Sequence, residues 1–527
     1  YAQIFSSDKF QTYIAVVFLK QDEEKTEKAL RGVGFNRPPI MTSHLPKESV
    51  KKREKVITPT QISLEDCTMK NYYDIAIIGG GIGGLMTAYR ITEKNPSASV
   101  CIIEKGHAIE QRTCPIVTKK VDKCIKCPSC AIMEGLAGAG AFSDGKYVIS
   151  TEYGGWLTEF LKPQTVIDYI EQADKILVSF GATTERFSPD NELKKLCLRH
   201  DLHMNQAQLK HLGTDSNFET MRRLIEDLRT RCDIITDTEV TDVNRDTLEI
   251  LMHSKQGDFS CQAGKVIFAV GRVGSRFFSR WCTENNIALS NNQVDIGVRV
   301  ELPAIVWEDF SKRIYEPKIW YRSKGYGDKT RMFCFNERGS VVTENTDGVL
   351  TVNGHSYRDQ SRKTENSNFA LLSTIRFTEP FKQPIDYARH VASLANLISG
   401  GGVLVQRLGD LENGRRTDAK RLANSTTQPT LNAVPGDLSL CMPKRQLDNI
   451  IETLHALDAV APGTANYDTL LYGIECKYYS ARPQTENFMI SGCKNIYAIG
   501  DGAGFTRSLS QAAANGLYVA DQICSEN

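Results

Sequence analysis

The sequence has little net charge, no long apolar run and no internal repeat or low-complexity segment. Its 527 residues carry 64 Lys and Arg against 63 Asp and Glu, a formal net charge of +1, so composition implies no nucleic-acid partner. The apolar run at residues 13–19 is far too short to span a bilayer. A basic run at residues 47–55 is best interpreted as a solvated helix or linker. A polyanion-binding protein and a membrane-spanning protein are therefore both disfavoured.

A disulfide scaffold is also excluded, although the chain has 15 cysteines. A chain of this length does not need covalent staples, and several of its thiols, such as Cys101, sit in apolar strands and are predicted to be reduced and buried. We therefore expect the cytoplasm or another reducing interior compartment. The chain begins at Tyr1 and not at Met, so an organelle stays open.

The most informative stretch is a strand, turn, helix and strand over residues 74–104. Its first strand, residues 75–78, runs into a glycine-rich turn. There Gly79 allows a sharp turn, Gly81 lets the backbone approach a pyrophosphate at the helix N-terminus, and Gly84 lets helix and strand pack closely. Glu104 ends the second strand and is placed to accept hydrogen bonds from an adenosine ribose. Together these features predict a dinucleotide site.

Two later segments indicate which dinucleotide is bound. Residues 495–514 form a short strand, a turn at Gly500-Asp501 and an Ala-rich helix, similar to the closing motif of glutathione-reductase-type FAD proteins. Residues 265–271 resemble the mid-chain strand and glycine turn of that family. Three motifs in this order favour FAD. A second GxGxxG is lacking, so NAD(P)H, if it is the donor, must bind elsewhere. The predicted FAD contacts are Gly79, Gly81, Gly84, Glu104, Lys105, Gly140, Ser143, Gly271, Gly500, Asp501 and Gly504.

The length predicts two or three domains. We expect an α/β chain with a Rossmann-type, glutathione-reductase-like FAD-binding domain, an interleaved α+β substrate domain and a small N-terminal α/β appendage. The expected boundaries are 1–72 for the appendage, 73–153 for the first FAD part with a cysteine loop, 154–235 for a helical segment, 236–294 for a β-meander and strand, 295–483 for the substrate domain and 484–527 for the closing motif. Helices are expected at 23–31, 166–180, 218–232, 388–398 and 447–459, and strands at 11–20, 295–301, 348–353 and 371–377.

A cysteine-rich loop follows Glu104. Three cysteines form a CxxCxxC pattern, and a Cys-Pro pair precedes them; the thiols are Cys114, Cys124, Cys127 and Cys130. Pro128 makes a regular helix through the pattern improbable. Four interpretations stay open: an iron–sulfur cluster, a structural zinc, a redox disulfide near the flavin, or a set of free thiols.

Residues 138–146 resemble the signature of a bacterial family of uncharacterised FAD-dependent dehydrogenases, known broadly as NAD(FAD)-utilising dehydrogenases. The resemblance covers about residues 70–527 and includes the cysteine loop of one branch of the family. It implies bound FAD in a two-dinucleotide-type fold, with no settled substrate. Further similar segments are 211–215, 269–278, 297–303, 352–356, 367–372, 377–380, 435–439, 475–483 and 500–514.

Catalytic side chains must lie beside the flavin ring, so segments next to the FAD motifs are the natural source. Glu475 or Tyr478 is a candidate proton donor, and Arg482 could hold an anionic substrate or a flavin carbonyl. Residues 142–146, with Lys146, and residues 507–508 are further candidates. His211 is a candidate proton relay. An ordinary structural role is an open alternative for each.

These patterns predict an FAD-dependent oxidoreductase that reduces or dehydrogenates a small organic molecule. The main alternative is an electron-transfer flavoprotein that passes electrons between FAD and a metal cluster in the cysteine loop to a protein partner. A flavin-dependent RNA-modifying enzyme rests on fold analogy alone, and the neutral charge argues against it. A non-catalytic FAD-containing subunit of a larger assembly is the remaining alternative, and the oligomeric state is not determined by the sequence.

Overall fold

The computed structural model describes residues 2–7, 12–16 and 69–525, except residues 119, 122, 123, 126, 128, 206, 347, 358, 379, 380 and 382. The chain divides into two compact units, Tyr1–Asp66 and Cys67–Asn527. In the first unit, β1 (Ala2–Ser7) pairs antiparallel with β2 (Thr12–Val16). Of the strand expected at residues 11–20, the described residues 12–16 form β2, and the helix expected at residues 23–31 lies outside the described residues.

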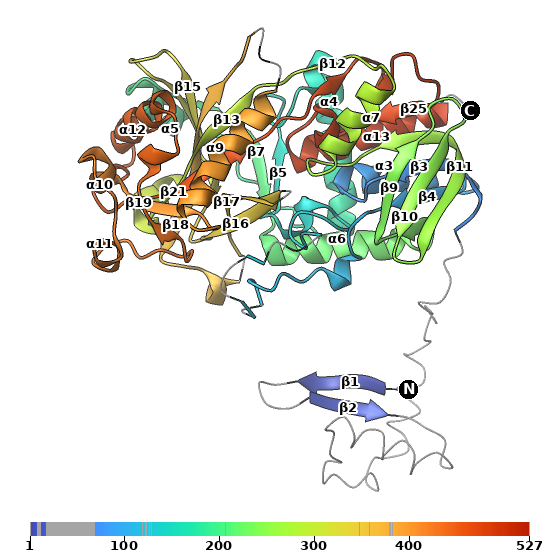
Figure 1. Cartoon of the computed structure of the whole chain (residues 1–527), viewed down its shortest axis with the longest axis horizontal. Helices are drawn as coiled ribbons and strands as arrows, with labels where there is room; N and C mark the ends of the chain where they lie inside the picture. Colours follow the sequence, from blue (N-terminus) through green and yellow to red (C-terminus); the bar gives the residue numbers. More distant parts are fainter. Residues whose placement is uncertain are drawn as a thin grey trace, which may run out of the picture. The chain divides into compact units, whose positions relative to one another are not determined.

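The second unit contains two large sheets, which lie at opposite sides of Figure 1. The first sheet has a parallel centre in the order β25-β11-β3-β4-β8. β4, β25 and the last residues of β3 and β11 are buried apolar runs, as expected for parallel strands covered on both faces. Their bounds are β3 (Tyr72–Ile78), β4 (Val100–Ile103), β8 (Asp233–Ile235), β11 (Gly257–Phe268) and β25 (Ile496–Ala498), with β9 (Thr238–Val243), β10 (Glu249–Ser254), β23 (Thr485–Glu486) and β24 (Met489–Ile490) extending the sheet.

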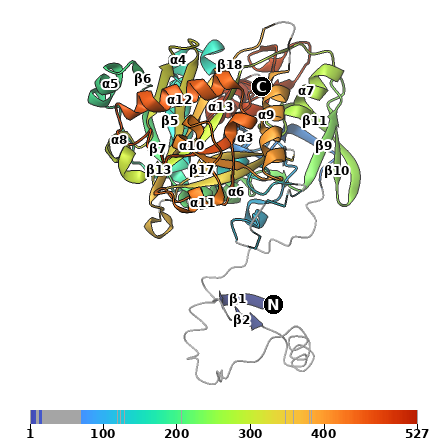
Figure 2. The same ribbon diagram turned by 60° about the vertical axis from the view of Figure 1, so that its left-hand side comes forward.

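Helices from both ends of the chain cover this sheet. α3 (Ile82–Lys94) and α13 (Leu509–Ser525) lie side by side in both views (Figures 1 and 2) and pack in one apolar core with the parallel strands. Gly516 makes the close contact possible, because a Cβ there would lie 2.3 Å from the Gly83 carbonyl oxygen. Segments from the beginning and the end of the second unit thus pack together in one Rossmann-like domain. The other helices of this core are α4 (Pro163–Ser179), α6 (Thr214–Leu228) and α7 (Ser275–Glu284).

The second sheet is antiparallel apart from its β19–β20 edge. Its order is β20-β19-β21-β13-β18-β15-β14-β6. The mixture of strands and helices confirms the α+β character predicted for residues 295–483. The bounds are β20 (Val434–Pro435), β19 (Leu404–Arg407), β21 (Leu470–Lys477), β13 (Val294–Pro303), β18 (Asn366–Ile375), β15 (Lys329–Asn336), β14 (Lys318–Arg322) and β6 (Leu202–Asn205).

The two faces of the second sheet differ in chemistry. Along β13, residues 294, 296, 298, 300 and 302 enter an apolar core with the neighbouring helices. The alternate positions carry Asp295, Arg299 and Glu301, each fully buried. Because side chains alternate along a strand, this second face is a buried polar layer. The helices in or beside the apolar core are α5 (Asn191–Leu198), α8 (Glu308–Ile314), α9 (Pro384–Ile398), α10 (Leu408–Glu412) and α12 (Lys444–Asp458), and α11 (Ala419–Ala423) lies further along the chain.

Short paired strands join the two domains. The hairpin β16 (Ser340–Thr346) and β17 (Val349–His355) packs on β19 and β21. β5 (Lys146–Ile149) pairs with β7 (Gln208–His211), and β12 (Leu289–Ser290) with β22 (Arg482–Pro483). The segment 154–235, predicted as helical, holds α4, α5 and α6 but also β6, β7 and β8. These strands have three or four residues each, too few for an alternating pattern to be detected in the sequence.

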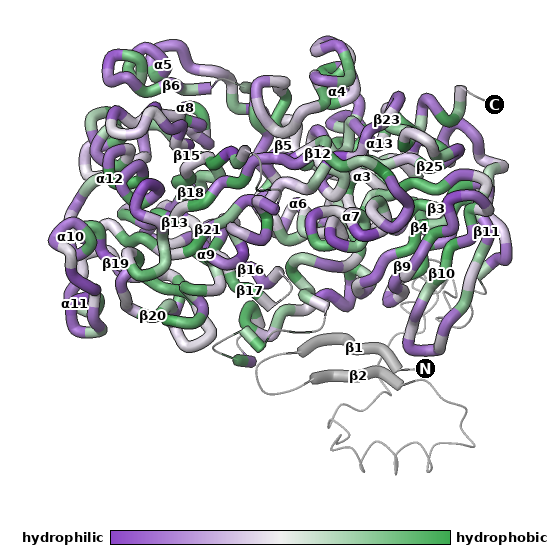
Figure 3. Tube along the Cα trace, turned by 45° about the horizontal axis from the view of Figure 1, so that its top comes forward, coloured by the Kyte–Doolittle hydropathy of each residue, from purple (hydrophilic) through white to green (hydrophobic). Residues whose placement is uncertain are grey.

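Hydropathy follows this architecture. Figure 3 shows apolar colouring along β3, β4 and the strands of the second sheet, with polar colouring at peripheral elements such as α11. Within the described residues, every helix is too short or too polar to cross a bilayer.

Candidate functional site

A cavity of about 1200 Å³ lies between the Rossmann-like domain and the polar side of the second sheet. Its walls come from the β3–α3 turn, the end of β4, residues 132–144, the turn after β11 and the segment 499–509. The opposite wall comes from β15, the β16–β17 hairpin and the end of β21. Every predicted FAD contact except Gly84 lines this cavity: Gly79, Gly81, Glu104, Lys105, Gly140, Ser143, Gly271, Gly500, Asp501 and Gly504.

The β3–α3 turn has the geometry of a nucleotide cradle. Gly79 has φ +108°, and a Cβ there would lie 2.4 Å from the Ala269 carbonyl oxygen. A Cβ at Gly84 would lie 2.2 Å from the Gly79 oxygen, so Gly84 serves close packing and not ligand contact. Gly81 is the N-cap of α3, no side chain of the described chain caps it, and the first turn holds no acidic residue. The unpaired N–H groups and the helix dipole therefore favour an anion here.

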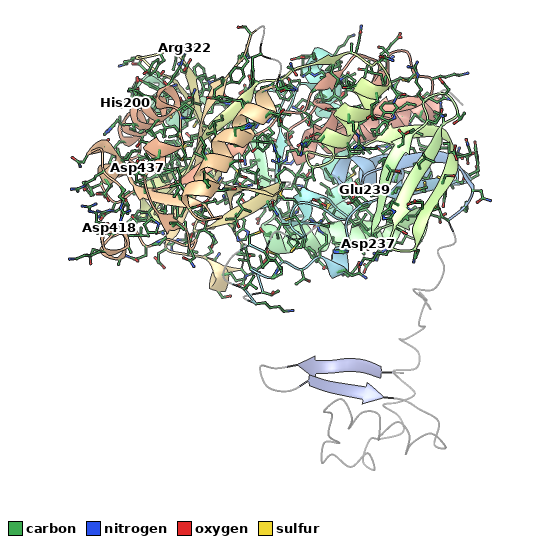
Figure 4. The ribbon with its side chains drawn as sticks, viewed as in Figure 1. His200, Asp237, Glu239, Arg322, Asp418 and Asp437 are labelled. Carbon is green, nitrogen blue, oxygen red and sulfur yellow. The ribbon has the colours of Figure 1, made fainter. Side chains whose placement is uncertain are left out.

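Glu104 lies at the position expected for a ribose contact. Its carboxylate accepts hydrogen bonds from the backbone N–H groups of Gly80 (2.8 Å), Gly106 (2.9 Å) and Gly135 (3.1 Å). A carboxylate has about four lone-pair sites, so acceptor capacity is left for a ribose hydroxyl. Beside it, the Lys105 ammonium lies 3.0 Å from a Glu239 carboxylate oxygen on β9, the strand at which Figure 4 labels Glu239.

The closing segment forms the second half of the cradle. At Gly500 (φ +76°) and at Gly271 (φ +64°), no described atom lies within 4 Å of the point where a Cβ would stand, so both backbones are open to the cavity. The Asp501 carboxylate accepts a hydrogen bond from the Thr506 hydroxyl (2.6 Å), and burial raises the pKa of its carboxyl. The turns at Gly271 and Gly500 present backbone without side chains, which fits close approach by the diphosphate of FAD. The Asp501 carboxylate supplies acceptors that fit the hydroxyl groups of the ribityl chain.

A buried ionic cluster joins the two domains at one side of the cavity. Asp144 is its centre, with carboxylate oxygens 2.7 Å from His211 Nε2 and 2.9 Å from Lys146 Nζ. The Ser356 hydroxyl donates to Asp144 (2.5 Å), and Tyr315 OH lies 2.7 Å from His211. Lys146 lines the cavity, whereas His211 stands behind Asp144. The predicted relay residue and the predicted lysine thus meet through a residue that the sequence analysis did not single out.

The Asp144 cluster predicts a pH-dependent stability. Burial alone would raise the pKa of Asp144, but the charges of His211 and Lys146 hold it well below its usual range. A lowered folded-state pKa gives stability that is present above the unfolded value of about 3.9 and is lost as pH falls below it. Asp144→Asn should therefore destabilise the protein at pH 7, and the difference from wild type should shrink below about pH 4.

Urea unfolding at pH 7 and at about pH 2, closer to the lowered folded-state pKa, measures this difference. The exposed Asp168, which accepts only from Gln164 in the same helix, supplies the control Asp168→Asn. A wild-type to Asp144→Asn difference that is unchanged between the two pH values would contradict the assignment.

The polar segment 475–482 is divided by the structure. Tyr478 lines the cavity with Lys477 and Tyr479. Glu475 does not line it: this residue is fully buried on β21, where its carboxylate lies 3.0 Å from Lys477 Nζ and 3.5 Å from Arg299 Nη1. Arg482 is also outside the lining, because its guanidinium pairs with Glu159 and donates to the Gly504 carbonyl oxygen at 3.3 Å. Both positions differ from the expected contact with substrate.

His355 is one of the titratable cavity residues that were not singled out from the sequence. His355, at the end of β17, lines the cavity and packs edge-on against Tyr357 at 4.8 Å. Burial lowers the pKa of His355 to about 4, so its imidazole is neutral at pH 7. His355 lies in the segment 352–356, which resembles the bacterial FAD-dependent dehydrogenase family. That resemblance did not identify His355 itself as a candidate.

The four thiols of the cysteine loop are free. Cys114 lines the cavity, whereas Cys124 packs against the apolar cluster under the β16–β17 hairpin. Burial raises the pKa of the Cys130 thiol. Across the described residues, no group of three or more His, Cys, Asp or Glu side chains is placed to hold a metal ion. The metal site therefore stays a prediction from the cysteine spacing alone.

Two family models match separate parts of this chain. Residues 294–478 match the family "FAD-dependent protein, C-terminal domain-like", and residues 77–109 match the family "NAD(P)-binding Rossmann-like domain". An uncharacterized protein of Clostridium beijerinckii is 25% identical over 467 residues, which cover 85% of this chain and 80% of the relative.

Two solved structures with low similarity to the chain illustrate the structural matches. Glycine oxidase from Geobacillus kaustophilus has a TM-score of 0.38 at 12% identity and covers 87% of this chain and 96% of its own. L-proline dehydrogenase from P. horikoshii has a TM-score of 0.40 at 12% identity, with coverage of 87% and 95%. The two family matches show that residues 77–109 are similar to a Rossmann-like nucleotide-binding segment and residues 294–478 to the C-terminal domain of FAD-dependent proteins.

Proposed function

We propose that the protein binds FAD along the β3–α3 turn and the 499–509 segment and oxidises or reduces a small organic molecule in the second-domain half of the cavity. One observation carries the proposal: predicted FAD contacts from separate parts of the chain line a single cavity that continues onto the second sheet. Its volume of about 1200 Å³ exceeds the roughly 300–1,000 Å³ of ordinary ligand pockets. The cavity therefore has room for a dinucleotide and a substrate.

Each part of the cradle has a distinct task in this proposal. The N-terminal amides of α3 bind the diphosphate, Glu104 accepts from the adenosine ribose, and Asp501 accepts from the ribityl chain, as in the glutathione-reductase-type proteins that the motifs resemble. FAD, when bound, supplies hydride or electron transfer at its isoalloxazine ring. The protein supplies the orientation of that ring and the handling of protons.

Two cavity residues suit proton transfer. His355 is a neutral imidazole with free acceptor capacity among the described residues, so it can take a proton from a substrate hydroxyl or amine. Tyr478 is a phenol whose pKa burial raises far above its usual value, so it stays protonated at pH 7 and can donate a hydrogen bond to a substrate oxygen or nitrogen. Lys146 is less suited, because Asp144 and Asn336 (3.3 Å) hold its ammonium. It acts as a fixed positive charge.

The electron-transfer alternative depends on a metal cluster at Cys114, Cys124, Cys127 and Cys130. Among the described residues, no group of three or more ligand side chains is placed to hold a metal ion. The spacing of the cysteines is therefore the support for this alternative. Direct use of NAD(P)H is likewise a proposal that rests on the family resemblance. We therefore favour the small-molecule oxidoreductase.

Reconstitution with FAD tests the proposal. Purified protein mixed with FAD and desalted should retain the cofactor in stoichiometric amount and show flavin absorption bands. Anaerobic addition of NADH or NADPH then tests for bleaching, and metal analysis tests for a cluster in the same sample. A folded protein that retains no FAD would refute the proposed function.

A further inference from the structure

On the polar side of the second sheet, two guanidinium groups share one close carboxylate. Asp295, fully buried on β13, pairs with Arg331 and accepts a hydrogen bond from the Tyr479 hydroxyl. The guanidinium of Arg507 is the second cation near this carboxylate, but its Nη1 lies 3.9 Å from Asp295 Oδ2. One carboxylate thus serves two guanidiniums, and Arg331 is the closer partner.

Asp501 is not a close partner of Arg507 either. Its carboxylate is engaged by Thr506, and among the described residues no oxygen of Asp501 lies within 4.0 Å of the Arg507 guanidinium. Burial lowers the pKa of Arg507 and raises the pKa of Asp501. The Arg507 side chain is 21% exposed, and Asp295, its nearest carboxylate, is already paired with Arg331, so an anionic ligand here would gain a charge-assisted contact.

The Arg507 guanidinium is held in a fixed plane that faces the cavity. It stacks on the Tyr479 ring, 3.8 Å from the ring centroid, and Tyr479 in turn packs edge-on against Trp156 at 5.3 Å. The Phe333 ring lies on another side at 5.9 Å. These residues all line the cavity. Within the described chain the guanidinium donates no hydrogen bond, so its N–H groups are directed at open space between aromatic walls.

A second guanidinium faces the same region. Arg272 follows Gly271 in the turn after β11 and lines the cavity. It acts electrostatically on Asp501, as Arg507 does, and on Glu344 of β16. Among the described residues no carboxylate lies within 4.0 Å of it. The lysines of the same wall differ, because Lys318 is paired with Glu316 (3.1 Å) and Lys477 with Glu475 (3.0 Å).

We propose that Arg507 and Arg272 form an anion subsite and that the substrate is a carboxylate with an apolar or aromatic body. Guanidinium groups bind carboxylates through paired N–H donors, and the rings of Tyr479, Phe333 and Trp156 supply the apolar wall. The inference rests on the proposed function, because it places the substrate beside the FAD cradle. The diphosphate of FAD has its own proposed site at the N-terminus of α3.

Calorimetric titration of the FAD-loaded protein with benzoate tests the subsite, with benzamide as the uncharged analogue of the same shape. Benzoate should bind and benzamide should not. Arg507→Met should weaken benzoate binding about 10- to 100-fold, the effect of losing a charged hydrogen-bond pair. Arg272→Met should weaken it by a smaller factor, and Arg507→Lys should retain part of the affinity. Arg322→Met, on the exposed side of β14 in Figure 4, is the matched control and should leave binding unchanged.

The outcomes separate the inference from the function on which it rests. Flavin absorbance of each variant reports FAD content, and calorimetry reports the anion, so the two are measured independently. Equal binding of benzoate and benzamide, or unchanged benzoate affinity in Arg507→Met, would overturn the anion subsite while leaving FAD binding intact. Loss of FAD by a folded Arg507→Met would overturn it too, because Arg507 would then hold the cofactor. If the folded wild-type protein retains no FAD, the proposed function is refuted. Benzoate titration of that FAD-free protein would still decide whether the anion subsite exists.

Discussion

Gly81→Asp is expected to abolish FAD binding without destabilising the fold. No described atom lies within 4 Å of a Cβ at Gly81, and its backbone is extended (φ −73°, ψ 177°), so the side chain fits. Asp is also a favoured N-cap residue. Its charge, however, would face the diphosphate. Two unit charges about 4 Å apart repel by about 4 kcal/mol at an effective dielectric constant of about 20, which is roughly a thousandfold in affinity. FAD titration followed by flavin fluorescence measures the loss.

Two further variants separate charge from size. Gly81→Asn has nearly the same shape without the charge and should lose much less affinity. Gly402→Asp adds the same charge outside the cavity, at a position where the nearest atom to a new Cβ is 3.8 Å away, and should bind FAD like wild type. If Gly81→Asp binds FAD normally, the β3–α3 turn is not the diphosphate site.

Arg299→Met is expected to cost about 3–5 kcal/mol of the free energy of unfolding, the usual loss when one partner of a buried ion pair is removed. Arg299 is fully buried and donates to Asn368 Oδ1 (2.8 Å) and to the Cys334 carbonyl oxygen (2.7 Å). Its loss would leave Glu475, also fully buried, with Lys477 as its only close cation in the described chain. Urea unfolding at pH 7 measures the change.

Glu475→Gln in the Arg299→Met background should recover part of that loss, because the stranded charge disappears. The exposed Arg322→Met should change stability by less than about 0.5 kcal/mol. A small effect of Arg299→Met together with a large loss of turnover in Glu475→Gln would instead support the catalytic role first suggested for Glu475 by its sequence neighbours.

The FAD cradle could be predicted because its signal is local. Gly79, Gly81 and Glu104 lie within one βα unit, where strand, turn and helix fix their relative positions. The side chains of the catalytic wall could not be predicted in this way. Glu475 lies on β21 and Tyr478 directly follows that strand, yet Glu475 is fully buried away from the cavity and Tyr478 lines it. Strand alternation alone does not say which face meets a neighbouring domain, and His355 carried no pattern of its own.

The sequence by itself determined the Rossmann-like βα unit, the order of the nucleotide motifs and the α+β character of residues 295–483, because each depends on short-range periodicity and glycine placement. Only the tertiary structure decided that Asp144 joins Lys146 to His211, that Arg299 neutralises Glu475, and that Arg507 shares Asp295 with the closer Arg331. Most of these contacts join residues that are tens to hundreds of positions apart. Charge compensation is a property of three-dimensional distance, which no local pattern encodes.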